Sequence, residues 1–299
     1  MATVGAAVRA TVWAAEDWRA READHHRRVD DLTAEHRERR AHGHRHPGED
    51  FLFTYYPFTP AALRRWHPGP GVALADAARD ERARWRFMRS DRDRVQLDAP
   101  AYLAARGSTV EFVRSLLNAT ASRPAHLGCL ALHEWAMVYR LDQESVRHRR
   151  LPLRLGSAGT DLVVESLPLT CTHFDAFRFF TDPARPRNAV QPKRIDQVDL
   201  DQPGCLHAGM DLYKWAMKLA PAIPSELVAD CFGHARSLRV LDMRASPYDV
   251  TELGYEPIPI ETPAGKAAFT AYQQEYAVLS QALRARLLEA CDAILAYRQ

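Results

Sequence analysis

The sequence predicts a mainly α-helical protein, a single globular domain of packed helices with a small β element and a long C-terminal helix. Three observations predict this class. The segments after residue 98 follow one another as helical patterns, strand-like alternation is confined to a short region, and no clean linker divides the 299 residues. We therefore expect one domain over 1–299, with a solvent-facing helix in 1–45, an aromatic, Pro-rich and β segment in 46–98, and a helical body in 99–299.

The first third of the chain contains the predicted β element. Residues 14–41 predict a solvent-facing helix, because Glu, Arg and Ala dominate and apolar anchors are few. The run 51–56 is too aromatic and too short for a helix, and prolines follow it. Short strands are expected at 71–75 and within 84–97, where the pattern alternates on either side of an Asp-Arg-Asp turn.

The rest of the chain is expected to be mostly helical. Ser108 and Glu111 have the spacing of a capping box and predict the start of an apolar helix. The stretch 151–200 is rich in Pro and Arg and predicts irregular structure, with short strands near 151–154 and 162–165. Further helices are predicted at 128–141, at 204–219, at 224–240, and from the Thr-Pro boundary at 262–263 to the C-terminus.

The composition restricts the class of protein. Apolar residues make up 46% and charged residues 26%, which is ordinary for a soluble globular chain. The net charge of +2 gives no overall positive field for nucleic acid. The five cysteines form no CxxC pair and no signal peptide is evident, so we expect reduced thiols and a cytoplasmic location. No apolar run is long enough to span a bilayer, so no membrane partner is expected.

Three segments each carry a histidine near a carboxylate, within otherwise apolar sequence. A buried polar group without a partner costs roughly 1–3 kcal/mol, so we expect the three pairs to converge on one site. A converged site would be a 2-His-1-carboxylate triad or a carboxylate-rich dimetal centre. The alternative is local pairing, between His207 and Asp211 one helical turn apart, and between Glu134 and Arg140 or Arg123. The three pairs are His133/Glu134, His173/Asp175 and His207/Asp211.

Two further polar clusters are visible. The stretch 184–194 places basic residues on a Pro-containing loop, which suits phosphate binding as well as an ordinary surface. In 239–250, Asp242 and Arg244 are expected to form a structural pair or a clamp. No P-loop, no GxGxxG and no GxSxG elbow is present, so neither a nucleotide cofactor nor a serine nucleophile is indicated.

Several long strings resemble a group of actinobacterial proteins labelled 3-methyladenine DNA glycosylase. They are "HPGEDFLFTYYPFTPAALRRWHPG", "LHEWAMVYR", "CTHFDAFRFFT", "QPGCLHAGMDLYKWAMKL" and "LDMRASPYD", and the resemblance spans about residues 46 to 266. The helix-hairpin-helix signature "LPGxGxxTA" of better-known alkyladenine glycosylases is absent from this chain. The resemblance therefore implies an activity, but it does not identify a catalytic residue of this chain.

The implied activity is DNA base excision, which cleaves the N-glycosidic bond of an alkylated purine in double-stranded DNA without a cofactor. This reaction needs aromatic faces for the extruded base, a carboxylate to stabilise the sugar cation, and contacts to phosphates. The candidate faces are Tyr55, Tyr56, Trp135, Phe174 and Trp215. The candidate catalytic residues are Asp211, Asp175 and Glu134, with His207 orienting, and the candidate phosphate contacts are Arg187, Lys193 and Arg194.

Two other functions remain open on the sequence. One is a metal-dependent oxidase or hydrolase of a small molecule, in which Fe, Zn or Mn is held by His133, His173 and His207. The other is a non-catalytic nucleic-acid-binding module, in which the histidine–carboxylate pairs are only structural.

Overall fold

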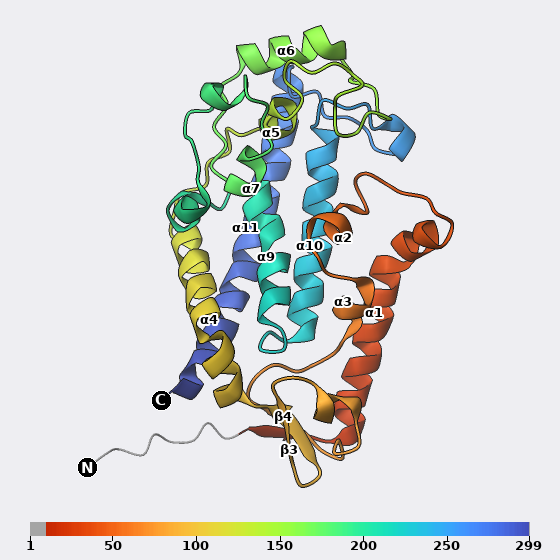
Figure 1. Cartoon of the computed structure of the whole chain (residues 1–299), viewed down its shortest axis with the longest axis vertical. Coiled ribbons are helices and arrows are strands. Elements are labelled where there is room, and N and C mark those ends of the chain that lie inside the picture. The colour runs from red at the N-terminus through yellow and green to blue at the C-terminus, as the bar shows by residue number, and fades with distance from the viewer. Residues whose placement is uncertain (1–9, 299) are drawn as a thin grey trace, which may run out of the picture.

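Five long helices run side by side along the length of the molecule in the computed structural model, which describes residues 10–298 (Figure 1). The prediction of a mainly α, single-domain fold with a long C-terminal helix is confirmed. These helices are α1 (Ala15–Ala41), α4 (Ala99–Ala121), α9 (Leu206–Leu219), α10 (Ser225–Arg244) and α11 (Pro263–Leu295).

The central layer is formed by α9, α10 and α11. Helix α9 packs against both of the others, and α11 also packs along α4. Gly209 allows this close approach, because a Cβ atom there would lie 2.6 Å from Leu238 Cδ1 and 2.8 Å from Ser280 Oγ. The resulting apolar core includes Met210, Phe232 and Phe269. Within residues 10–298, none of the helices combines the length and the apolar character that a membrane span needs.

A small sheet lies at the end of the molecule near the C-terminus (Figure 1). Its strand order is β1-β2-β4-β3, with β1 parallel to β2 and the other pairs antiparallel. The strands predicted at 71–75 and within 84–97 are confirmed, while β1 was not predicted. The strands are β1 (Thr11–Trp13), β2 (Val72–Leu74), β3 (Met88–Asp91) and β4 (Arg94–Leu97).

Two predictions in the first half of the chain are wrong. Residues Phe51–Tyr55 form the short helix α2, which buries Phe51 and Leu52 and packs Phe53 against Phe232. Helix α4 starts at Ala99, well before Ser108, because Asp98 Oδ1 accepts a hydrogen bond from the Ala101 amide at 3.1 Å. Other short elements are α3 (Pro60–Arg64), α8 (Gln197–Leu200) and the 3₁₀ segments Glu81–Arg84, Arg185–Arg187, Arg194–Asp196, Thr251–Leu253 and Ala296–Arg298.

The segment between α4 and α9 differs most from expectation. Only Leu132–Ala136 (α5) is helical within 128–141, because Leu130, Ala131 and Arg140 adopt positive φ angles of 49°, 55° and 58°. The strand predicted at 162–165 lies inside helix α6 (Gly156–Ser166), and near 151–154 only a single bridge joins Leu153 to Tyr248. Helix α7 (Phe174–Phe177) completes this region.

Helix α1 is less exposed than its composition suggested. It packs against α3 and α10, and one stripe of the helix is buried. The stripe is largely polar, which explains why a count of apolar anchors does not reveal it. Its members are Trp18, His25, Val29, Thr33 and His36.

His67, which follows α3, makes the fold sensitive to acid. Its side chain is buried, Nδ1 has no hydrogen-bond partner among the described residues, and burial lowers its pKa to about 3. A histidine whose pKa is lowered by folding contributes its full stability only at pH values above its pKa in the unfolded state, about 6.5. That stability is lost as the pH falls towards 3. The loss from this residue approaches about 1.4 kcal/mol per pH unit.

We expect His67→Leu to remove this contribution. Urea unfolding at several pH values between 7 and 4 should give a flatter pH dependence for the variant than for the wild type. Parallel pH profiles for the two proteins would show that His67 is not protonated on unfolding.

Candidate functional site

Three histidines meet where α5, the segment before α7, the first turn of α9 and the last turns of α10 come together (Figure 1). His133 belongs to α5, His173 immediately precedes α7, and His207 lies in the first turn of α9. The ring centroids of His133 and His207 are 4.5 Å apart, and those of His173 and His207 are 5.5 Å apart. All three are buried, so the structure places them together in the interior.

Helix α10 contributes two residues that hold His133. His133 Nε2 lies 2.8 Å from Asp242 Oδ1, and Arg239 Nη1 donates to Asp242 Oδ2 at 2.7 Å. Arg239 Nη1 also donates to Glu134 Oε1 at 2.6 Å. Arg239 and Asp242 are three residues apart on one face of the helix, which lets a single guanidinium bridge the two carboxylates.

These contacts change the acidity of the groups involved. Burial alone would lower the pKa of His133, but the Asp242 carboxylate outweighs it and holds that pKa well above its ordinary value. Burial would raise the pKa of Glu134, but the Arg239 guanidinium outweighs it and lowers the pKa to about 2. Glu134 is therefore ionised at neutral pH and paired with Arg239, and the predicted partners Arg140 and Arg123 are wrong.

His173 has one occupied and one free ring nitrogen. Nδ1 lies 3.0 Å from Asp201 Oδ1, and Gln197 holds the other oxygen of Asp201 at 3.0 Å. Nε2 is buried without a hydrogen-bond partner among the described residues, and the nearest carboxylate oxygen, Asp211 Oδ2, is 3.6 Å away. Burial would lower the pKa of His173, but Asp201 and Asp211 outweigh it and raise the pKa.

Asp211 is fully engaged with other residues. Tyr56 donates its hydroxyl to Oδ1 at 2.7 Å, and Lys214 contacts Oδ2. The Lys214 ammonium also lies 3.5 Å from Asp175 Oδ2, so it stands between the two carboxylates. Arg194 reaches Asp175 from the surface side at 3.3 Å. Asp211 and Asp175 therefore already share a cation.

His207 is the least satisfied of the three histidines. Its Nδ1 is buried and has no hydrogen-bond partner among residues 10–298. Burial, and then the neighbouring His133, lower its pKa well below the ordinary value, so the ring is neutral at pH 7. No hydrogen bond joins it to Asp211 within the described chain, and the local pairing proposed for these two residues is wrong.

Two groups of side chains have the geometry to hold a metal ion. In each group, one potential ligand atom per residue lies within 4.8 Å of the others. In the second group Lys214 lies between the two carboxylates, whereas in the first group the basic side chain Arg239 contacts Asp242 through Oδ2, and Oδ1 faces His133. The groups are His133, His207 and Asp242, and His173, Asp175 and Asp211.

Two small cavities flank His207. One is also lined by Cys129, Cys171 and Cys205 and offers about 10 Å³ to the centre of a water molecule. The other is also lined by Tyr55, Glu134, Asp175 and Arg239 and offers about 20 Å³. Cavities of this size hold about one water each. His207 therefore faces a cavity as the sequence suggested, but Asp211 does not line either one.

Most of the aromatic residues expected to hold a base are part of the core. Trp135 is completely buried and donates its ring N–H to the Ala245 carbonyl at 2.8 Å. Tyr56 is buried against Asp211, and Trp215 is covered by Phe112 and two lysines. These three rings offer no face to an incoming base in this structure, whereas Tyr55 and Phe174 are partly exposed.

The basic residues expected to bind phosphate are exposed. Arg187 donates to the Glu165 carbonyl at 3.1 Å and lies over the Tyr139 ring. Arg194 is paired with Asp175, while the Lys193 side chain extends from a surface segment. These side chains remain accessible to an anion, although Arg194 already has a carboxylate partner.

Three residues of the site were not identified as such from the sequence: Arg239, Asp242 and Asp201. Asp242 was expected to pair with Arg244. Arg244 instead donates a hydrogen bond from Nε to the Glu256 carbonyl at 2.9 Å. Arg239 and Asp242 could have been identified from the sequence, because they stand three residues apart among apolar residues of a predicted helical region. Asp201 has no such signal.

Comparison with protein-family models, with curated proteins and with solved structures finds no match to this chain, so its chemistry is inferred from the geometry above.

Proposed function

We propose that the protein is a metal-dependent enzyme, an oxidase or hydrolase of a small molecule, whose divalent Fe, Zn or Mn ion is bound by His133, His207 and Asp242. The observation that carries this proposal is the buried, neutral His207, which has a nitrogen without a partner among the described residues and a ring nitrogen within 4.8 Å of donor atoms of a second imidazole and a buried carboxylate. Two imidazoles and one carboxylate are the donor set of a 2-His-1-carboxylate site.

The charge balance of the interior supports a bound cation. Four buried carboxylates surround the histidines, whereas three basic side chains act on them in the described structure: Arg239, Lys214 and the buried Arg284, which attracts Asp201. Without an ion, His133 makes up part of the difference by holding a proton, because Asp242 holds its pKa well above the ordinary value. A divalent ion would displace such a proton. The four carboxylates are Glu134, Asp201, Asp211 and Asp242.

The surrounding residues have defined roles in this proposal. Arg239 orients Asp242, and the Cys129 thiol lies 3.5 Å from His133 Nδ1, which leaves Nε2 directed at the carboxylate. His173, held by Asp201, is placed next to His207 to hold or release a proton. The ion itself would supply an activated water or open coordination positions for a small oxidant.

The cavities beside His207 are too small to hold a nucleobase. Each cavity beside His207 accepts about one water, which is far smaller than a purine. Base excision with Asp211, Asp175 or Glu134 as the carboxylate would require the interior to open, and it stays a prediction, as does a non-catalytic role in DNA binding. We also expect the cytoplasm as the location, because all five thiols are free.

Elemental analysis of the purified protein tests the proposal. The wild type should contain about one equivalent of Fe, Zn or Mn per chain. The variants His207→Ala and Asp242→Asn should lose most of it, since each removes a ligand. The control is His234→Asn, a buried histidine on α10 that bonds Ser280 instead.

Two results would contradict the proposal. One is a wild-type protein that remains free of metal after expression with all three ions supplied. The other is a metal content that neither ligand variant changes, which would place the ion elsewhere.

A further inference from the structure

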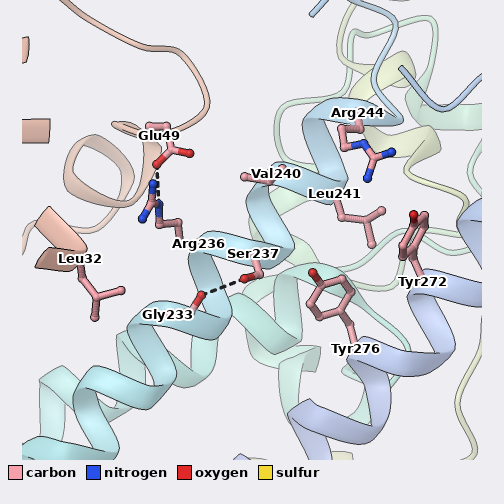
Figure 2. Close-up of a pocket in the computed structure, with 10 residues that line it drawn as sticks. All are labelled: Leu32, Glu49, Gly233, Arg236, Ser237, Val240, Leu241, Arg244, Tyr272 and Tyr276. Atoms are coloured by element: carbon pink, nitrogen blue, oxygen red, sulfur yellow. Dashed lines mark hydrogen bonds and ion pairs between the residues drawn. The ribbon is translucent and has the colours of Figure 1, made fainter. Parts of the chain in front are cut away.

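A second concave site lies on the far side of α10, between this helix, α1 and α11 (Figure 2). It offers about 320 Å³ to the centres of water molecules, far more than the cavities beside His207. Pockets that bind small organic ligands have volumes of this order. Six residues of α10 line it along one stripe, so the hollow is a feature of the helix face rather than of a loop: Gly233, Arg236, Ser237, Val240, Leu241 and Arg244.

Gly233 lines this hollow. It lies inside a 20-residue helix, where glycine is less favourable than alanine. Neither of the usual structural reasons for glycine applies, because its φ is not positive and a Cβ atom there would meet no atom within 4 Å. The missing side chain instead leaves space between α10 and the tyrosines of α11 (Figure 2).

The charged groups at the two ends of the hollow differ in how they are paired. Arg236 is neutralised by Glu49 at 2.6 Å and Glu35 at 3.3 Å. Arg244 donates a hydrogen bond from Nε to the Glu256 carbonyl. Its two Nη groups have no hydrogen-bond partner among the described residues. Its guanidinium lies 5.3 Å from the centre of the Tyr272 ring. One end of the hollow therefore presents a cation that lacks a counter-ion.

The rest of the lining suits an organic body. Figure 2 shows the hydroxyl ends of Tyr272 and Tyr276 facing α10, with Leu241 and Val240 along the helix beside them. Neither tyrosine hydroxyl is bonded to another described residue, and Tyr272 is exposed to solvent. A ligand with an anionic head and an apolar or aromatic body would satisfy the guanidinium, the hydroxyls and the apolar wall together.

We propose that this hollow is a binding site for a small organic anion, a carboxylate or a phosphate ester, whose acidic group pairs with Arg244 and whose body lies against Leu241 beside the two tyrosines. The site is separate from the histidine cluster, because Arg239 and Asp242 project from the opposite face of α10. Its existence does not depend on the proposed metal.

Calorimetric titration at low salt tests this site with three probes: benzoate, phenyl phosphate and the uncharged benzyl alcohol. At least one of the two anions should bind the wild type more tightly than benzyl alcohol, and the stronger of them identifies the head group. Arg244→Gln should weaken that binding about tenfold or more, because a charge-assisted bond is lost. Arg150→Gln, at an exposed arginine elsewhere, is the matched control and should bind as the wild type does.

A second pair of variants tests the hollow itself. Gly233→Phe should fill it and abolish binding, whereas Gly233→Ala should fold normally and bind within about twofold of the wild type. Metal content should be unchanged in all of these variants, which separates this site from the histidine cluster. The proposal is overturned if neither anion binds, if benzyl alcohol binds as tightly, or if the Arg244 and Arg150 variants bind equally.

Discussion

Replacing Arg239 with methionine is expected to destabilise the protein by about 3–5 kcal/mol, since it removes one member of a buried ionic network. The Arg239 guanidinium is 2% exposed and is bonded to both Glu134 and Asp242. Methionine fills a similar volume without charge, so the loss reports Glu134 left buried without its cation and Asp242 left with His133 alone. Urea unfolding at pH 7 measures the difference in free energy of unfolding.

The pH dependence of this effect has a defined sign. In the wild type the pKa of Glu134 is lowered to about 2. Its pairing with Arg239 therefore stabilises the folded protein at pH values above the pKa of Glu134 in the unfolded state, about 4.5. That contribution is lost as the pH falls from 4.5 towards 2. The gap between wild type and Arg239→Met should therefore narrow below pH 4.5.

The double variant Arg239→Met/Glu134→Gln provides the control. It removes the charge of Glu134, while Asp242 keeps His133 as its partner, and should recover part of the lost stability. A single-variant loss below about 1 kcal/mol, similar to that of an exposed ion pair, would show that Arg239 does not hold this part of the interior together.

Asp211→Asn is expected to cost about 3 kcal/mol, for the complementary reason. The substitution removes the carboxylate that Lys214 contacts and leaves the mostly buried ammonium with Asp175 at 3.5 Å. It also weakens the acceptor of the Tyr56 hydroxyl. Urea unfolding again gives the magnitude, and the exposed Asp199→Asn on α8 is the control.

The same variant distinguishes the two possible metal groups. If the ion is bound by His133, His207 and Asp242, the folded Asp211→Asn protein should keep its metal despite the lower stability. Loss of the metal from folded Asp211→Asn would instead assign the ion to the group of His173, Asp175 and Asp211.

Helices α9, α10 and α11 could be predicted because each carries its own apolar pattern, and α11 also carries a start signal. Helix α11 begins at Pro263, directly after its N-cap Thr262, as its sequence indicates, and α9 matches its predicted range closely. Helix α2 could not be predicted, because a helix of five residues has little stability of its own. It is stabilised by the burial of Phe51 and by the contact of Phe53 with Phe232 of α10. Tertiary contacts of this kind override local preference.

The candidate site was only partly predictable for a similar physical reason. Each of the three segments shows its own histidine, and apolar surroundings indicate burial, which favours a common interior location. The partners that hold these histidines come from elsewhere: Asp242 is 109 residues from His133, and Asp201 is 28 residues from His173. Such distant pairs leave no spacing pattern in a single sequence. Leu130 and Ala131 adopt left-handed backbone angles, so the helix cannot start at 128 as predicted. No sequence pattern indicates these angles either.

The position of the metal ion is the most direct test of the proposed centre. Crystals of the metal-loaded protein, measured at the absorption edge of the ion found by elemental analysis, should show one anomalous peak. We expect it within about 2.3 Å of donor atoms from His133, His207 and Asp242. A peak between His173 and Asp211, or no peak inside the protein at all, would contradict the assignment.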